Sequence, residues 1–429
     1  MWIVAVAFFG LMLLGMPIGV VIGVSGAIGL VQLGDVSFLA MAPKRYFEGL
    51  DMFTFMAMPF FILAGELMNA SGITQRLIAF ALSLVGYMRG GLAHANMVAS
   101  VLFAGMTGAA VSDAAAMGNT LVPAMVKQGY SKPFACAVTA AGSIIGPTIP
   151  PSNLMVIYGS IMGVSIAGLF AAGIVPGLLI CAICMAVIAA LGKKLGLPKG
   201  ERRPSLMSIL VSFKDSLLGL TMPAIILGGI LGGIVTPTEA ASIAVAYAMF
   251  VGFVVYRTLT LRQVGVMLIR TARITGSVFL IIAAASILSW WLTFHQIPQM
   301  IAQAMLSVAS SKEGVLGLIL LLLLFVGMFL DITAALIILA PVLGPLTAAV
   351  GIDPVHAGIM IILALNISLM TPPVGACLFV LCSVTGEKME RIARALAPFL
   401  LAEVAILFLI TYWSDLTLFV PRLFGYVQP

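Results

Sequence analysis

The chain has 429 residues, of which 62% are hydrophobic and only 8% are charged. An ordinary soluble domain carries roughly 25% charged residues, so the composition excludes a soluble fold of this size. The net charge of +6 comes from basic residues grouped in loops, and no nucleic-acid partner is needed to explain it. We therefore expect an all-α polytopic membrane protein that is embedded in a lipid bilayer.

Residues 1–34 are expected to form an uncleaved first membrane span. They hold no charged residue, whereas a secretory signal peptide has a basic leading region and an apolar core of only ~7 to 15 residues. Uncharged stretches such as 166–192 and 217–236 are also as long as the ~20 residues that cross a bilayer. Cys181 and Cys184 have the C-x-x-C spacing, but they lie mid-span without nearby His ligands, which favours buried thiols over a metal site.

A re-entrant helical hairpin is predicted at about 90–127. The stretch between Arg89 and Lys127 is too long for one span, and Gly105-Met-Thr-Gly108 and Ser112-Asp113 interrupt its middle. Because both of its ends are basic, a hairpin that enters from the cytoplasm fits better than two full crossings. Its polar tip would then lie inside the protein near the membrane midplane.

A discontinuous helix is predicted directly after the hairpin, at about 133–163. Its middle reads Gly146-Pro-Thr-Ile-Pro-Pro-Ser-Asn153, and two successive prolines end one helix and preset the first turn of the next. The break exposes carbonyls at the end of one half-helix and amides at the start of the other. Carbonyls suit a small hard cation such as Na⁺, and helix N-termini suit a carboxylate.

A basic connector at 193–215 separates the two halves of the chain, and the positive-inside rule predicts that it is cytoplasmic. Its basic residues are Lys193, Lys194, Lys199, Arg202, Arg203 and Lys214. Two further basic clusters follow, at Arg257, Arg262, Arg270 and Arg273, and at Lys388, Arg391 and Arg394. Both ends of the chain are poor in basic residues, so we expect both termini to be periplasmic.

The second half, 216–429, repeats the pattern of the first half, 1–192. Asp113 recurs as Asp331, and Pro150-Pro151 recurs as Pro372-Pro373, roughly half a chain later. This predicts a second hairpin at about 314–345 and a second broken helix at about 355–384. Since one half begins outside and ends inside, and the other does the reverse, the repeats are predicted to be inverted.

Two Na⁺ sites and one substrate site are predicted at these breaks. The first Na⁺ site is assigned to Thr107, Ser112, Gly146, Thr148 and Pro150. Its symmetry mate is assigned to Gly327, Thr333, Thr371 and Pro372. The substrate site is assigned to Gly108, Asp113, Ser152, Asn153 and Asp331, between the hairpin tips. No cofactor is expected.

Several of these residues also have a purely structural interpretation. Asp113 and Asp331 could each stabilise a helix start, because an acidic residue in the first turn favours the amide end of the helix dipole. Gly108 and Gly327 could serve only close helix contacts. Thr236, Pro237 and Glu239 are predicted to form a capping box, which accounts for them without any role in transport.

Five segments carry a resemblance to a known family: Met58–Glu66, Thr107–Gly118, Gly146–Ser152, Thr236–Ala241 and Met370–Gly375. In this order they resemble the large membrane subunit of tripartite ATP-independent periplasmic (TRAP) transporters, and the similarity covers essentially the whole chain. One departure concerns the first hairpin tip, which usually reads Ser-Gly-Ser in the family. Here Thr107-Gly108-Ala109 keeps one hydroxyl and loses the other.

The resemblance implies an elevator-type mechanism that is coupled to a Na⁺ gradient. It also implies two partners, a periplasmic substrate-binding protein and a small four-helix membrane subunit, which is expected to be a separate chain. The predicted function is Na⁺-coupled uptake of small organic acids, such as C4-dicarboxylates or sialic acid, across a bacterial inner membrane.

Two other functions remain open at this point, and a third is disfavoured. A Na⁺/organic anion symporter that needs no binding protein has similar sequence features, and a passive channel is also possible. An intramembrane enzyme is disfavoured, because the chain has no zinc-ligand set, Ser/His pair or phosphate-binding loop.

Overall fold

The computed structural model describes residues 2–34, 36–200, 204–309 and 311–427. Within these ranges the chain is helical and forms no β-strand, apart from one isolated bridge between Arg89 and Lys199. Seven described helices are long and apolar enough to cross a membrane, or eight if the bent segment 132–162 counts as one span. The expected polytopic α-helical architecture is therefore confirmed.

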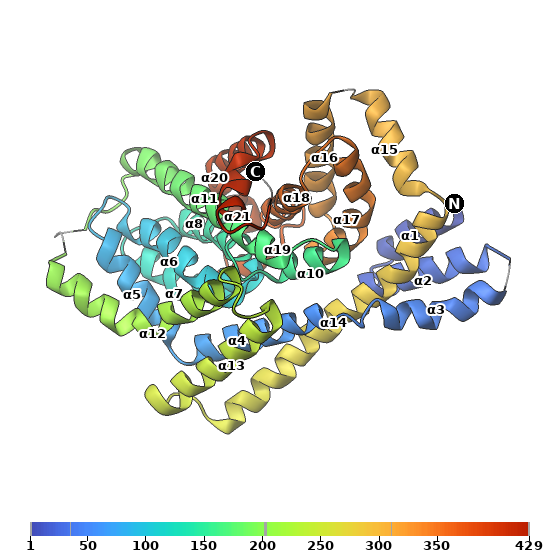
Figure 1. Cartoon of the computed structure of the whole chain (residues 1–429). Helices are drawn as coiled ribbons and strands as arrows, with labels where there is room; N and C mark the ends of the chain where they lie inside the picture. The colour runs from blue at the N-terminus through green and yellow to red at the C-terminus, as the bar shows by residue number, and fades with distance from the viewer. Residues whose placement is uncertain (1, 35, 201–203, 310, 428–429) are drawn as a thin grey trace.

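The first half of the chain contains the elements α1 to α11 and one 3₁₀ turn (Figure 1). Their bounds are α1 Trp2–Leu13, α2 Ile18–Val31, α3 Val36–Glu48, η1 Phe53–Met56, α4 Ala57–Ala70, α5 Ile73–Val85, α6 Gly91–Thr107, α7 Ala110–Lys127, α8 Lys132–Ser143, α9 Ile145–Thr148, α10 Asn153–Met162 and α11 Ile166–Lys194.

The second half contains α12 to α21 and one π-helical turn. Their bounds are α12 Leu206–Leu231, α13 Pro237–Phe250, η2 Val251–Val255, α14 Leu261–Phe294, α15 Ile297–Val308, α16 Lys312–Gly327, α17 Ile332–Ala349, α18 Pro354–Ser368, α19 Ala376–Thr385, α20 Met389–Tyr412 and α21 Asp415–Leu423.

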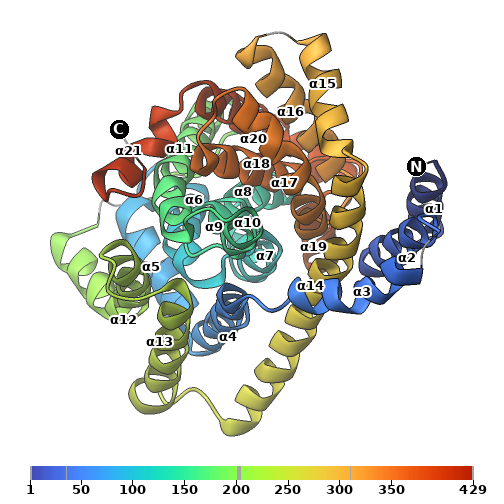
Figure 2. The ribbon, with the colours of Figure 1, turned by 45° about the vertical axis from the view of Figure 1, so that its right-hand side comes forward.

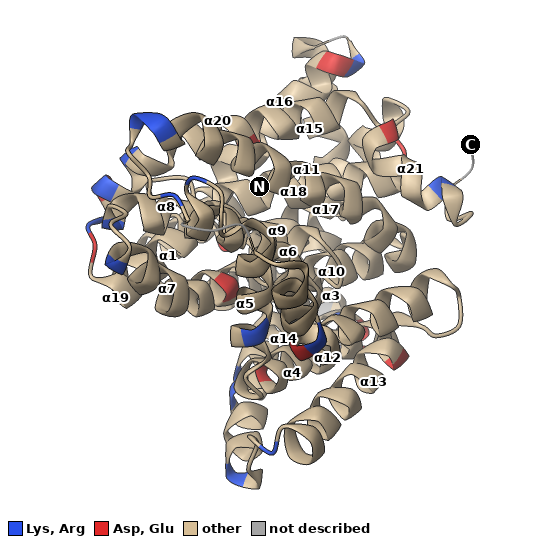
Figure 3. Cartoon of the chain, turned by 90° about the vertical axis from the view of Figure 1, so that its left-hand side faces the viewer, with Lys and Arg blue, Asp and Glu red and all other residues tan. Residues whose placement is uncertain are grey.

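The connector between the halves is shorter than its charge pattern suggests. Helix α11 continues to Lys194, and α12 already begins at Leu206, so the last part of the 193–215 segment is helical. Arg202 and Arg203 lie outside the described residues. Figure 3 shows Lys and Arg gathered mainly along the left-hand side of the molecule, near α8, α19 and α20.

Helix α13 begins with the capping box that the sequence predicts. The Thr236 backbone N–H donates to Glu239 Oε2 at 2.8 Å, and the Glu239 N–H donates to Thr236 Oγ1 at 3.3 Å. Pro237 occupies the start of the helix, where its missing N–H costs nothing. These contacts confirm the structural interpretation of the three residues.

Two helical hairpins and two interrupted helices form a bundle with α11 and α20. The hairpins are α6–α7 and α16–α17, and the interrupted helices are α8–α9–α10, which bends by 40°, and α18–α19. The Pro150-Pro151 and Pro372-Pro373 peptide bonds in the two interruptions are both cis. Figure 2 shows this bundle lying above α4, α12 and α13, while the long helix α14 rises along its right-hand side.

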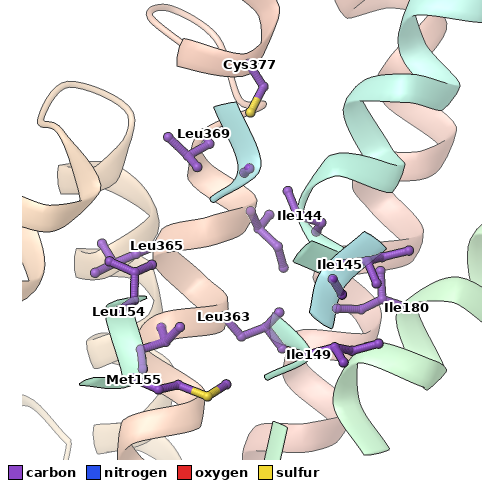
Figure 4. Packing of buried hydrophobic residues seen from close by; sticks show 14 of the residues in the cluster. Ile144, Ile145, Ile149, Leu154, Met155, Ile180, Leu363, Leu365, Leu369 and Cys377 are labelled. Atoms are coloured by element: carbon purple, nitrogen blue, oxygen red, sulfur yellow. The ribbon is translucent and has the colours of Figure 1, made fainter. Parts of the chain in front are cut away.

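The two interrupted helices pack against each other in the centre of the bundle. Figure 4 shows Ile144, Ile145 and Ile149 lying between Leu363 of α18 and Ile180 of α11. These side chains are all buried. In a bilayer, apolar burial has little hydrophobic driving force, so close packing and dispersion hold such contacts together.

A line of glycines joins α2 to α14 outside this bundle. A Cβ on Gly26 would lie 3.1 Å from Ile287 Cγ2, and a Cβ on Gly29 would lie 2.8 Å from Trp291 Cδ1. At Gly23 the nearest atom, Ala284 Cβ, is 3.5 Å away, which is an ordinary contact. The missing side chains therefore let the two helices approach closely.

We expect Gly29→Ala to destabilise the protein by about 1 to 3 kcal/mol, because the new methyl group must displace the buried, rigid Trp291 ring. Gly23→Ala is the matched control on the same helix, and we expect it to be at least as stable as wild type, because alanine favours a helix over glycine and meets no clash there. Chemical unfolding in detergent micelles measures both. Equal stability of the two variants would show that the α2–α14 contact is looser than described.

Candidate functional site

The tips of the two hairpins open into one cavity of about 520 Å³. The first tip contributes Gly108 to Ser112, and the second contributes Asp331 to Thr333. The first interrupted helix adds Pro147, Asn153, Leu154 and Ile157. The remaining wall consists mainly of α4 and α14, which lie outside the bundle that carries the tips.

The first tip requires glycine at its turn. Gly108 ends α6 with a φ of +58°, a left-handed conformation that side chains disfavour. A Cβ at this position would also lie only 2.6 Å from the Pro151 carbonyl oxygen. Gly108 therefore lets the hairpin tip contact the break of the first interrupted helix directly.

Asp113 lies behind this tip, in the first turn of α7, and its side chain is buried. Its Oδ2 atom contacts Gly146 of α9 so closely that a Cβ there would overlap it. Asp113 thus joins the hairpin to the interrupted helix. It does not line the cavity.

A polar contact links the two interrupted helices. The Asn366 Nδ2 group donates to Thr148 Oγ1 at 3.4 Å, and Thr148 Oγ1 donates to the Ile144 carbonyl at 2.7 Å. Both side chains are buried. The pairing connects α9 of the first half with α18 of the second.

Three side-chain oxygen atoms at this junction have no hydrogen-bond partner within the described part of the chain. They are Ser152 Oγ, Asn153 Oδ1 and Asn366 Oδ1. Buried polar atoms are normally paired, so each such atom calls for an explanation. Carbonyl and hydroxyl oxygens are also the ligand type that hard cations prefer.

The second tip is held by a helix cap. Asp331 Oδ1 accepts hydrogen bonds from the Thr333 N–H at 2.9 Å and the Ala334 N–H at 3.2 Å. This is the helix-start role that Asp331 could have from sequence alone, although the residue also lines the cavity. The two aspartates that recur in the sequence therefore differ in position, since Asp113 lies inside the first turn of α7 and is not its N-cap.

The second break is packed by Gly327, where a Cβ would overlap Ser368 Oγ. Ser368 Oγ donates to the Leu365 carbonyl at 2.6 Å, and Thr371 Oγ1 donates to the Ile367 carbonyl at 3.0 Å. Thr371 is half-buried and its hydroxyl bonds only within its own turn. The three residues lie together around the end of α18.

The structure brings five of the sequence-predicted residues into the cavity wall: Gly108, Ser112, Asn153, Asp331 and Thr333. Another group does not line it: Asp113, Gly146, Thr148, Pro150, Ser152, Gly327, Thr371 and Pro372. The side chain of Thr107 lies outside the described part of the chain. Asp113 and Ser152 are predicted from the sequence to bind substrate, but their side chains are buried behind the cavity and do not line it.

The sequence reasoning missed the wall that α4 and α14 supply. Glu66 and Asn69 of α4 and Ser277 of α14 line the cavity, and Arg270 pairs with Glu66 at 3.3 Å. Glu66 follows the apolar run Met58–Gly65. An ionisable residue within an apolar segment is a functional candidate by default, so this signal was present in the sequence.

Glu403 is a second missed carboxylate, and it lies in the middle of α20. Its side chain is fully buried, and the Cys184 thiol donates to Glu403 Oε1 at 3.2 Å. The contact joins α20 to α11, and neither residue lines the cavity.

Comparison with known proteins identifies the family of this chain. Residues 5–416 match the family described as the DctM component of tripartite ATP-independent periplasmic transporters. The chain belongs to this family. Its members named below are transporter permease subunits, so the protein is a multi-pass membrane transport protein and not an enzyme.

Two relatives match the chain along almost its full length. The sialic acid TRAP transporter large permease protein SiaM of Vibrio cholerae is 41% identical, covering 98% of this chain and 98% of SiaM. The C4-dicarboxylate TRAP transporter large permease protein DctM of Pseudomonas aeruginosa is 38% identical, covering 94% of each chain. The resemblance read from the motifs is therefore confirmed.

A solved structure supports the fold alone. The MtrF transporter of Neisseria gonorrhoeae is similar with a TM-score of 0.59 at 14% sequence identity, covering 87% of this chain and 84% of MtrF. The arrangement of helices is thus similar to that of MtrF, although few residues are identical.

We expect Asp331→Ala to destabilise this DctM-family protein by about 0.5 to 2 kcal/mol, because two amides at the start of α17 lose their acceptor. Asp331→Asn should keep nearly the wild-type stability, because Asn caps a helix as well as Asp does. Chemical unfolding in detergent micelles separates the two variants.

Asp353 provides the matched control for Asp331, because it caps α18 through Val355 N–H and His356 N–H and lies outside the cavity. The same pair of substitutions there should give the same difference in stability. If Asp331→Ala were as stable as Asp331→Asn, the cap would not contribute and the Asp331 contacts would need another explanation.

Proposed function

We propose that this protein is the translocating subunit of a Na⁺-coupled uptake system for small organic acids. The observation that carries the proposal is the cavity between the two hairpin tips, which helices of both halves of the chain surround. A cavity at the meeting point of interrupted helices is typical of secondary transporters. Sialic acid and C4-dicarboxylates, which name the two relatives, are both organic acids.

The interrupted helices support Na⁺ as the coupling ion. We assign one ion to the oxygens around Gly146, Thr148 and Pro150, next to the tip residues Thr107 and Ser112. The symmetry-related ion is assigned to Gly327, Thr333, Thr371 and Pro372. The partnerless oxygens of Ser152, Asn153 and Asn366 lie at the same junction, and hard cations prefer such ligands.

The substrate is assigned to the cavity itself. Its carboxylate would face the amide end of α10, near Asn153, or the start of α17, since helix N-termini attract anions. Gly108 and Asp331 form the adjacent parts of the two tips. Asp113 and Ser152 lie behind the cavity wall, where they would hold the first hairpin tip against the interruption of the first broken helix.

The proposal includes inverted repeats and an elevator-type movement. The moving block would consist of both hairpins and both interrupted helices, and α4 and α14 would belong to the scaffold. The matched order of α6–α10 and α16–α19 supports the repeat. The proposal also includes periplasmic termini, a small four-helix membrane subunit and a periplasmic binding protein that delivers the substrate.

Reconstitution in proteoliposomes tests this function. We expect an inward Na⁺ gradient, but not a K⁺ gradient, to drive uptake of radiolabelled sialic acid or succinate when the binding protein and the small subunit are present. A Na⁺ ionophore should abolish it. Uptake without the binding protein would favour the self-sufficient symporter, and non-saturating flux would favour a channel.

We expect Thr371→Val to raise the Na⁺ concentration for half-maximal uptake at least about fivefold, a loss of about 1 kcal/mol. The valine keeps the shape of threonine but removes the oxygen. Thr371→Ser keeps the hydroxyl and should retain wild-type Na⁺ dependence. Unchanged Na⁺ dependence in Thr371→Val would rule out ligation by this side chain.

A further inference from the structure

The cavity that we assign to an organic anion contains no basic side chain among its described lining residues. Its two ionisable groups are Glu66 and Asp331, which are both acidic. An incoming carboxylate would be repelled by any of these charges that is not compensated. The proposed Na⁺ ions and helix N-termini would attract the ligand, and the two acidic side chains need compensation of their own.

Asp331 is already compensated inside its own tip. Its Oδ1 accepts from two amides at the start of α17, where the helix dipole is positive. Glu66 has no such helix end beside it, since it lies inside α4, which spans Ala57–Ala70. Glu66 is therefore the acidic group that an anion in the cavity would meet.

Arg270 of α14 compensates Glu66 from outside the cavity lining. Its Nη1 lies 3.3 Å from Glu66 Oε2, and the Arg270 side chain is 67% exposed while that of Glu66 is 22% exposed. Exposed ion pairs of this kind contribute little net stability. The guanidinium can therefore leave Glu66 for another anion at little cost.

The positions of the two residues on their helices place this pair at the edge of the cavity. The lining residues of α14 are Ile274, Ser277, Val278 and Ile281. Their spacing follows one helix face, and Arg270 lies one turn before Ile274 on that face. Arg270 therefore extends this face of α14 beyond the cavity lining, and it belongs to the basic cluster of residues 257–273.

We propose that Arg270 is a specificity-determining residue for organic anions, which exchanges its guanidinium between Glu66 and the carboxylate of the ligand. Arginine suits this exchange because its planar fork binds a carboxylate through two parallel hydrogen bonds. The inference rests on the proposed function, and it adds the group that admits an anion to an otherwise acidic cavity.

Equilibrium binding to the purified chain in nanodiscs with Na⁺ present tests the exchange without any binding protein. The probes are radiolabelled sialic acid and radiolabelled succinate. We expect Arg270→Gln to raise the Kd about tenfold, because it removes the cation and leaves Glu66 unpaired. Glu66→Gln should lower the Kd about threefold, because Arg270 is then free for the ligand.

The double variant and a charge control sharpen the test. Combining Glu66→Gln with Arg270→Gln should bind more tightly than Arg270→Gln alone, because no unpaired carboxylate remains. Arg262→Gln removes the same charge from the same helix two turns away, and its Kd should stay within about twofold of wild type. Arg270→Lys should be intermediate, since it keeps the charge and loses the fork.

The outcomes distinguish a failure of this inference from a failure of the proposed function. Wild-type binding together with an unchanged Kd in Arg270→Gln overturns the role of Arg270 alone. An equal loss in Arg262→Gln also overturns it, because the effect would then be one of net charge. If wild type binds neither probe, the proposed substrate class is wrong and the inference is wrong with it.

Discussion

The structure depends on one constraint, which is that every backbone amide and carbonyl inside a bilayer needs a partner. The interruptions at Pro150-Pro151 and Pro372-Pro373 break this condition twice in the middle of the bundle. At the first interruption, Pro150 to Ser152 are buried, and the Gly108 tip approaches the Pro151 carbonyl closely. At the second, Gly327 packs against the Ser368 side chain at the end of α18, while Pro373 and Val374 are exposed. The first hairpin therefore encloses its interruption more completely than the second hairpin does.

The same arrangement explains why the polar residues concentrate where they do. Thr148 and Asn366 join the two interrupted helices, and Asp113 joins the first hairpin to Gly146. The cavity then lies on the open side of this junction, with α4 and α14 as its other wall. In the proposed function, a substrate held there would contact the bundle on one face and the outer helices on the other.

Much of the architecture could be predicted from local signals. The apolar composition, the Pro pairs and the glycines at the tips indicate a membrane protein with interrupted helices, and the capping box at Thr236 was predicted from its residues alone. The ion pair of Glu66 and Arg270 could not be predicted in this way. Its partners are far apart in the chain and meet only because α4 packs beside α14.

The sequence by itself determined the class of protein, the places where helices break and the family, because these follow from residue type and order within short segments. The tertiary structure decided which polar groups face the cavity. Asp113 and Asp331 recur in the two halves of the sequence, yet one is buried against Gly146 and the other caps α17 at the cavity wall. The difference arises because the helices packed against a side chain determine its surroundings. The local sequence pattern does not specify those contacts.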